Sequence, residues 1–163
     1  MQIKVKKLRP GARLPVLGSA CAAGADLHAC LDYDLATIAC HQTVKIATGI
    51  AVEIPDGYFG AIFARSGLAT KSGLRPANCV GVIDSDYRGE VLVALHNDTD
   101  QNQMITNGER IAQLVIMPVI TAEYKEVSEL SVTDRGDGGF GSSGEREVTK
   151  KKRQKLASGY GEW

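Results

Sequence analysis

Five short segments of the chain carry residue types that could bind or hydrolyse a phosphorylated ligand. In chain order they are AGADL (23–27), ARSGLA (64–69), GVIDSDYRGE (81–90), GERIAQL (108–114) and RGDGGFGSSG (135–144). Arg65 and Ser66 open an expected helical turn, where a guanidinium, a hydroxyl and free backbone N–H groups together form a phosphate site. An ordinary serine N-cap beside a surface arginine is the alternative interpretation.

The glycine-rich segment 135–144 is a second candidate phosphate site. Its backbone amides could wrap phosphate oxygens, and Arg135 adds a positive charge. A flexible linker would have the same glycine content, but a linker has little use for Phe140, whose ring could stack on a base. No G-K-[ST] sequence follows, so this is not a P-loop of the Walker type.

Two carboxylates, a phenol and an amide complete the candidates. Asp84 follows an apolar run and could take a proton from water, although a polar β-turn would explain the same residues. Tyr87 comes three residues later, and its ring could pack on a sugar face. Asp26 suits a turn or a buried hydrogen-bond acceptor. Gln113 stands in an apolar strand, where an amide needs partners such as a phosphate oxygen or a neighbouring backbone.

The elements that must position these residues are mostly strands. Apolar and β-branched runs predict strands at 3–8, 43–55, 59–64, 90–97 and 110–120. Gly, Pro, Asp and Asn separate these runs, which is typical of an all-β sandwich or barrel. Segment 66–74 has helix formers between serine and glycine, and it predicts one or two helical turns.

A chain of 163 residues suits one domain with a sizeable core. We expect a β-barrel core over 1–133, a mobile glycine-rich segment over 134–144 and a basic, disordered tail over 145–163. The 19 basic and 19 acidic residues balance, yet six basic and three acidic residues follow Gly144. Because the core lacks the clustered basic face that duplex DNA requires, nucleic-acid binding would be confined to the tail, for which a solvated extension is the preferred interpretation.

Cysteine usage and hydropathy indicate the compartment. The four cysteines, Cys21, Cys30, Cys40 and Cys79, form no C-x-x-C pair and no zinc-finger spacing, so reduced thiols are expected. The N-terminal residues show no signal peptide, and no run approaches the roughly 20 apolar residues of a membrane span. The sequence therefore predicts a cytoplasmic protein without a membrane partner.

Taken together and in this order, the five segments resemble the five motifs of the homotrimeric dUTP diphosphatase (dUTPase) family. The resemblance covers the chain up to Gly144, and GVIDSDYRGE and RGDGGFGSSG are its most specific parts. It implies an all-β, distorted jelly-roll or β-barrel fold with one short helix, and a homotrimer whose three active sites are each built from all three chains. The implied reaction is hydrolysis of dUTP to dUMP and pyrophosphate, which limits uracil incorporation into DNA and supplies dUMP for thymidylate synthesis.

The resemblance also implies which residues meet the phosphates. Arg65, Ser66, Gly67 and Gln113 are expected to contact them. Asp84 is expected to orient and deprotonate a water for in-line attack on the α-phosphorus. The cofactor is expected to be Mg²⁺, held mainly by the triphosphate and not directly by the protein, with Asp26 in the water network around the metal or in the scaffold.

For the deoxyuridine half, the resemblance implies a hairpin from Asn78 to Leu92 whose backbone reads the uracil edge. The residues expected to line it are Asn78, Val82, Ile83, Tyr87 and Leu92. Tyr87 is expected to exclude ribose by close packing where the 2′-hydroxyl would lie. The fifth segment is expected to close over the nucleotide, with Phe140 on the uracil and Arg135, Ser142 and Ser143 on the distal phosphates, and Gly141 is also expected to bind substrate.

Two departures from the family pattern and two rival functions remain. Asp137 places a negative charge in the fifth segment, where we expect it to point outward, and Ala25 lacks an aromatic ring that many members carry. A dCTP deaminase would share the fold but needs a glutamate beside the base, whereas the pattern from Asp84 to Tyr87 favours the hydrolase. A non-catalytic member that only binds nucleotide or a protein is the second rival, and the intact Asp84 argues against it.

Overall fold

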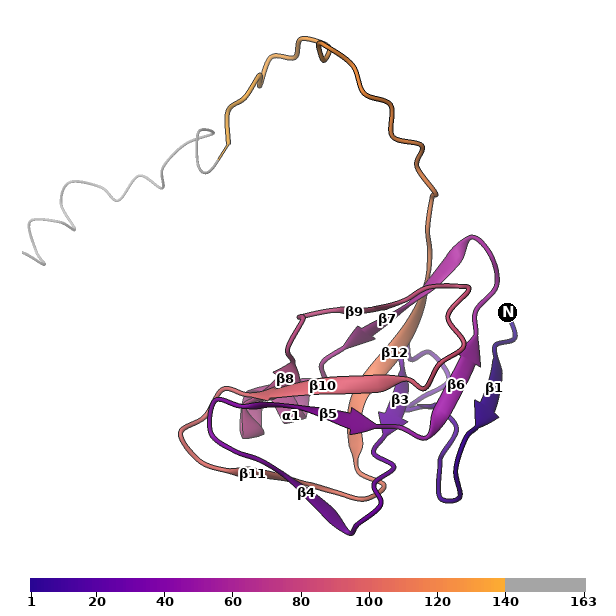
Figure 1. The fold of residues 1–163 in the computed structure, drawn as a ribbon, viewed down its shortest axis with the longest axis vertical. Coiled ribbons are helices and arrows are strands. Elements are labelled where there is room, and N and C mark those ends of the chain that lie inside the picture. The colour runs from indigo at the N-terminus through magenta and orange to yellow at the C-terminus, as the bar shows by residue number, and fades with distance from the viewer. Residues whose placement is uncertain (140–163) are drawn as a thin grey trace, which may run out of the picture. The chain divides into compact units, whose positions relative to one another are not determined.

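Strands dominate the computed structural model, which describes residues 1–139 (Figure 1). The strands are β1 (Lys4–Lys7), β2 (Val16–Leu17), β3 (Ala25–His28), β4 (Leu35–Ile38), β5 (Thr43–Ala47), β6 (Ile50–Glu53), β7 (Tyr58–Phe63), β8 (Leu74–Pro76), β9 (Gly81–Ile83), β10 (Leu92–Asn97), β11 (Gln103–Thr106) and β12 (Arg110–Pro118). In the described residues one helix, α1 (Ser66–Ser72), accompanies them. The expected all-β fold with one short helix is therefore confirmed.

The strands form one five-stranded sheet and three smaller ones. In the large sheet the order is β2-β3-β12-β7-β9, so that β12 lies between β3 and β7 and β9 is the last strand. The smaller sheets are β5-β10-β8, β11-β4 and β1-β6 (Figure 1). All the pairs are antiparallel. Strands far apart in the sequence are thereby neighbours. The first and fourth motifs share the large sheet through β3 and β12, the third motif begins on it at β9, and the second motif follows β7 directly.

The core lies between these sheets and follows the alternation of strand side chains. In β10, Val93, Leu95 and Asn97 point inward while their neighbours are more exposed. The large, fully buried apolar side chains come from most of the sheets: Leu27, Ile38, Ile46, Ile50, Ile54, Leu74, Val91, Val93, Leu95, Ile105 and Ile111. This packed interior gives the site residues a rigid support.

One predicted strand is divided in two. The run 43–55 forms β5 and β6, because Gly49 between them has a left-handed backbone with φ of 70°. A side chain at this position would also meet the Cβ of Ala12 and the Sγ of Cys30, both 2.8 Å from the added carbon. The turn lets β5 pair with β10 while β6 pairs with β1.

Helix α1 follows β7 directly and ends at Gly73. Arg65 is its N-cap residue, with extended backbone and no side-chain capping bond. Gly73 ends it in a left-handed conformation with φ of 62°, as expected for a glycine after a helix. The helix is therefore two residues shorter than the predicted segment 66–74, and its start places Arg65 at the end of the large sheet.

The chain divides into two units, Met1–Ala122 and Glu123–Trp163. All the strands and α1 belong to the first unit. In the second, the described residues 123–139 contain short turns, including a bond from Gly136 N to Thr133 O at 3.1 Å. Among the described residues, no helix has the length and apolar character needed to cross a membrane. The tail predicted over 145–163 lies outside the described residues, and the functional division at residue 133 stays a prediction.

Candidate active site

Asp26 joins two arginines from different elements. Its Oδ1 accepts a hydrogen bond from Nε of Arg65 at 2.8 Å, and its Oδ2 accepts one from Nη1 of Arg110 at 3.2 Å. Nη1 of Arg65 also donates to the backbone oxygen of Arg110 at 3.3 Å. The Asp26 side chain is only 14% exposed, whereas those of Arg65 and Arg110 are 27% and 55% exposed. One buried carboxylate thus holds two cations that reach toward solvent, which is an arrangement suited to polyphosphate.

Gln113 occupies the adjacent position on β12. In the sheet register it lies opposite Asp26 on one side and Phe63 on the other. Its Nε2 donates to the backbone oxygen of Ala64 at 2.9 Å, so the predicted polar partner is a neighbouring backbone. A side chain at Gly24 would come within 3.0 Å of Oε1 of Gln113, so the glycine of the first motif leaves space for this amide. Ser66 and Gly67 are exposed at the start of α1 beside this cluster.

His28 is a buried residue beside the same cluster that sequence reasoning did not single out. It is 9% exposed, it lies opposite Arg110 in the sheet register, and its Nδ1 is buried without a hydrogen-bond partner in the described residues. Burial lowers the pKa of His28, and the positive charges of Arg13, Arg110 and Arg65 lower it further, while Asp26 opposes them. A neutral imidazole therefore adjoins the arginines at neutral pH.

Asp84 lies in a second cluster, built from the third motif. It opens a turn in which the N–H of Tyr87 donates to its backbone oxygen at 3.2 Å, so the polar turn is real. The same residue lines a surface hollow of about 230 Å³, together with Val82, Ile83, Tyr87, Glu90 and Leu92. The structure thus brings together Asp84 and four of the residues predicted to bind deoxyuridine. Asn78, the fifth, is exposed in the turn before β9.

The third motif does not form a paired hairpin between its two strands. β9 pairs with β7, while β10 pairs with β5 and β8, so the motif crosses from one sheet to another. This corrects the expected hairpin from Asn78 to Leu92. The consequence is favourable for binding, because β9 is the last strand of its sheet in the described residues. Its outer edge presents backbone donors and acceptors, which can pair with the edge of a base as with another strand.

Tyr87 is fixed at the rim of this hollow. Its hydroxyl donates to the backbone oxygen of Glu90 at 3.0 Å, and its ring lies directly over Gly89. A side chain at Gly89 would collide with the Tyr87 hydroxyl, which explains the glycine at this position. The guanidinium of Arg88 donates to the backbone oxygens of Ser85 and Tyr87 and braces the turn.

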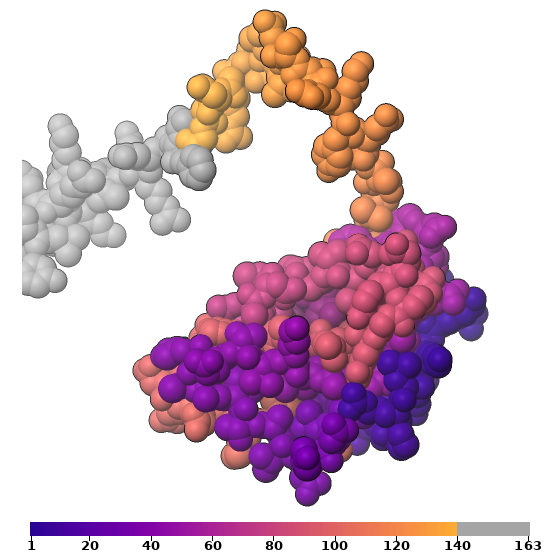
Figure 2. Space-filling view, viewed as in Figure 1, coloured from indigo at the N-terminus to yellow at the C-terminus, as the bar shows by residue number. Residues whose placement is uncertain are grey.

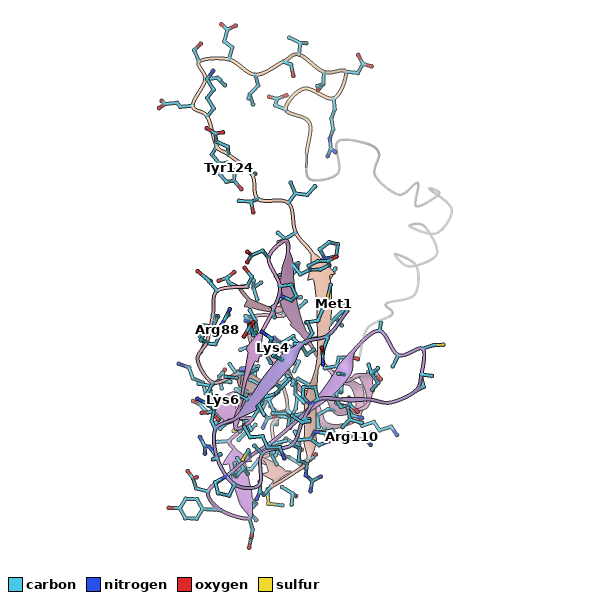
Figure 3. All side chains as sticks on the ribbon, turned by 90° about the vertical axis from the view of Figure 1, so that its right-hand side faces the viewer. Met1, Lys4, Lys6, Arg88, Arg110 and Tyr124 are labelled. Atoms are coloured by element: carbon cyan, nitrogen blue, oxygen red, sulfur yellow. The ribbon has the colours of Figure 1, made fainter. Side chains whose placement is uncertain are left out.

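The two clusters are far apart in one chain. Ile83 lies opposite Gly60 on β7, and Arg65 follows Gly60 by five residues of extended chain. At about 3.3 Å per residue, this separates the backbone of Ile83 from that of Arg65 by roughly 17 Å, and Asp84 lies one residue further from Arg65. In Figure 3 the labelled Arg88, which follows Tyr87 in the chain, and Arg110, which binds Asp26, also lie apart. Within one chain, Asp84, the predicted general base, is therefore not next to Arg65, a residue predicted to bind the phosphates.

The remaining predicted site residues are in the fifth motif. Arg135 is exposed, and its Nε donates to the backbone oxygen of Gly138 at 2.7 Å. Asp137 is exposed as well. Phe140, Gly141, Ser142 and Ser143 lie outside the described residues. The roles of all these residues stay predictions.

Residues 1–139 contain no group of three His, Cys, Asp or Glu side chains arranged to hold a metal ion. Asp26 and Asp84 are single carboxylates in separate clusters, and both oxygens of Asp26 already bind guanidinium groups. Neither carboxylate of the described residues therefore offers a ready-made set of metal ligands by itself.

Three further residues of these clusters, Arg110, Glu90 and Arg9, were not predicted from the sequence as site residues. Arg110 stands within the fourth motif, but its contact with Asp26 depends on the pairing of β12 with β3. Glu90 lines the hollow and binds Arg9, which lies 81 positions earlier and outside the five segments. Arg110 could have been predicted, because it lies in the GERIAQL segment three residues before Gln113. Arg9 lies in none of the five segments, so no sequence signal points to it.

Comparisons with known proteins identify the family of this chain. Residues 11–144 match the family model described as dUTPase. The deoxyuridine 5'-triphosphate nucleotidohydrolase of Hydrogenobaculum sp. (strain Y04AAS1) is 50% identical over 144 residues, which cover 88% of this chain and 99% of that protein. The enzyme of the same name from Candida albicans is 44% identical and covers 87% of each chain.

Solved structures show the same fold. A Staphylococcus bacteriophage 80alpha dUTPase mutant with dUpNHpp has a TM-score of 0.79 and 33% identity, covering 88% of this chain and 98% of that one. A mutant dUTPase from phage phi11 of S. aureus, whose structure describes the coordination of a structural Mg(II) ion, has a TM-score of 0.72 and 26% identity, covering 81% of this chain and 100% of that one. With a family match over more than three-quarters of its length and both clusters in place, this chain belongs to the dUTPase family.

Proposed function

We propose that Asp84 is the base in the reaction of this protein, the hydrolysis of dUTP to dUMP and pyrophosphate. The observation that carries this assignment is the position of Asp84 in the hollow, beside the free edge of β9 and next to Tyr87 and Leu92. Asp84 takes a proton from a water, the water oxygen bonds to the α-phosphorus, and the bond to the pyrophosphate oxygen breaks. An exposed carboxylate is a weak base, so positioning of the water accounts for much of its effect.

Deoxyuridine binds along β9 and against Tyr87. The backbone groups of the free strand edge, around Val82 and Ile83, pair with the uracil edge. A backbone N–H that donates to the 4-carbonyl of uracil would meet the amino group of cytosine instead. Two donors would then face each other without an acceptor, so cytosine is rejected. The 5-methyl of thymine and the 2′-hydroxyl of ribose are excluded by space, the latter at the Tyr87 ring.

The phosphates bind at the Asp26 cluster of a neighbouring copy. Arg65 and Arg110, held by Asp26, present two guanidinium groups from one surface. Mg²⁺ bound to the triphosphate would neutralise part of its charge and fix its conformation. Gln113 adds an amide beside these arginines, while Ser66 and Gly67 lie at the adjoining start of α1.

The separation of Asp84 from Arg65 supports a homotrimer with shared active sites. A single triphosphate cannot place its α-phosphorus beside Asp84 and its other phosphates on an Arg65 roughly 17 Å away in the same chain. A second copy can supply the Arg65 cluster, and a third the segment 135–144. We retain the cytoplasm as the compartment, since all four cysteines are free thiols.

The decisive experiment measures pyrophosphate release from dUTP by the purified enzyme with Mg²⁺, with dCTP, dTTP and UTP as comparison substrates. We expect rapid release from dUTP and slow release from the other three. If the enzyme does not turn over dUTP, the proposed function is wrong.

The same assay distinguishes the dCTP deaminase. Glu90 does line the hollow, but one of its oxygens binds both Gly49 N–H, at 2.7 Å, and the Arg9 guanidinium, and the other oxygen binds Arg9. A carboxylate held in this way is not free to act on a cytosine base, as the glutamate of a deaminase must. Release of ammonia from dCTP would overturn this interpretation.

A further inference from the structure

Glu90 is held in place from two sides by groups distant in the sequence. Nη2 of Arg9 lies 3.2 and 3.1 Å from its two carboxylate oxygens, and the N–H of Gly49 donates to Oε1 at 2.7 Å. Both side chains are largely buried, with 31% of Arg9 and 22% of Glu90 exposed. Figure 2 shows the N-terminal segment against the segment around residue 90 on one face of the molecule. The pair therefore ties the end of the third motif to the N-terminal segment.

The backbone of Glu90 anchors Tyr87. The Tyr87 hydroxyl donates to the Glu90 carbonyl at 3.0 Å, and Gly89 leaves the space in which the ring lies. Tyr87 and Glu90 line the same hollow as Asp84. A shift of Glu90 would move the acceptor of the Tyr87 hydroxyl and with it the rim of the hollow.

We propose that Arg9 is a positioning residue that sets the selection of deoxyribose over ribose, acting through Glu90 on Tyr87. This inference rests on the proposed function, in which the Tyr87 ring fills the space of a 2′-hydroxyl. A pocket that rejects one added hydroxyl by close packing does so by a modest factor, about a hundredfold. Such a factor depends on small displacements of the packed ring, so loosening its anchor reduces it.

The test compares kcat/KM for dUTP and for UTP in the full-length enzyme with Arg9→Gln. Glutamine keeps a polar side chain but removes the charge and the contact with both oxygens of Glu90. We expect kcat/KM for dUTP divided by kcat/KM for UTP to fall about tenfold. This factor corresponds to the loss of one charge-assisted hydrogen bond. The KM for dUTP is expected to rise while its kcat changes little, because Arg9 does not reach the reacting atoms. An unchanged ratio would overturn the proposal.

Two variants serve as matched controls. Arg75 also contacts both oxygens of one carboxylate, through Nε and Nη2 to Asp98 at 2.7 and 3.0 Å, on strand β8 away from the hollow. Arg75→Gln is therefore expected to leave the ratio unchanged. Asp32→Asn removes only the second partner of Arg9, a 79% exposed carboxylate at 3.1 Å, and is also expected to have no effect. An equal fall in the Arg75 variant would mean general loosening of the fold and would contradict the proposal.

Tyr87→Phe separates this inference from the proposed function. It removes the hydroxyl and keeps the ring, so it is expected to lower the ratio as Arg9→Gln does. The double variant is expected to be no worse than Tyr87→Phe alone, since both changes act on one chain of contacts. If Tyr87→Phe lowers the ratio and Arg9→Gln does not, only the role of Arg9 is wrong. If neither variant changes the ratio while dUTP is still hydrolysed, Tyr87 does not exclude ribose. The proposed positioning role of Arg9 is then wrong as well.

Discussion

Arg65 donates from Nε to Oδ1 of Asp26 at 2.8 Å, and this bond links the residue before α1 to strand β3. The second oxygen of Asp26 binds Arg110 on β12. One carboxylate therefore aligns the guanidinium groups of two motifs.

We predict that Asp26→Asn weakens substrate binding. Asparagine can accept from only one of the two guanidinium groups and leaves their charges uncompensated. A hydrogen bond between charged groups contributes about 1.5–3 kcal/mol, so the KM for dUTP is expected to rise roughly tenfold to a hundredfold. Steady-state kinetics measures this. Asp98→Asn, which loses its ion pair with Arg75 outside both clusters, is the control. A KM that changes no more than in the control would contradict the alignment role.

For Asp84→Asn we predict a different outcome, with turnover lost and binding kept. The amide cannot take the proton of the attacking water, so kcat is expected to fall by roughly a hundredfold to ten-thousandfold. Calorimetric titration with a non-hydrolysable dUTP analogue measures the affinity, which is expected to stay within a few-fold of the unchanged protein. Asp86→Asn, two residues away, is the control. Equal losses of affinity and turnover would mean that Asp84 mainly holds substrate.

Much of the site could be predicted from local patterns. Asp84, Arg65 and Gln113 stand in short segments whose residue types suggest chemistry without any knowledge of the fold. The helix at 66–72 lies within the segment 66–74 that its helix formers predict, and Gly73 ends it. These features depend on residues close together in the chain, which a sequence displays directly.

The contacts between segments could not be predicted in this way. The bond of Arg110 to Asp26 needs the register of β12 on β3, and the bond of Arg9 to Glu90 joins residues 81 positions apart. Short strands such as β8 and β9 have three residues each, too few for an alternating pattern. Their existence is decided by tertiary pairing, which overrides local preference.

The buried His28 predicts a loss of stability in mild acid. Its pKa in the folded state is lowered, first by burial and then by Arg13, Arg110 and Arg65, below the ordinary value of 6.5. Below that value the unfolded chain binds a proton that the folded chain does not, so the free energy of unfolding falls as the pH drops from about 6.5 toward the folded pKa. Urea unfolding at about pH 7.5, 6.5 and 5.5 measures this. In His28→Gln the slope is expected to be smaller, whereas His41→Gln, at an exposed histidine, keeps it.

Two shortened chains test the fifth motif. A chain that ends at Thr133 lacks Arg135 and the rest of the glycine-rich segment, and it is expected to lose most dUTP hydrolysis while it keeps its far-UV circular dichroism. A chain that ends at Gly144 retains the motif and is expected to keep nearly full activity. Full activity of the shorter chain would show that the segment does not take part in the reaction.

Mixing two inactive variants tests the shared active site. Asp84→Asn lacks the base and Arg65→Gln lacks the phosphate contact, so each homotrimer is expected to be nearly inactive. If Asp84 of one subunit works with Arg65 of another, subunits mixed at equal amounts by unfolding and refolding produce an intact combination in about a quarter of the sites. Activity near that fraction is therefore expected from the mixture, with each variant refolded alone as the control. A mixture as inactive as its components would place both residues of a site in the same chain, against the separation of about 17 Å that the strand register gives.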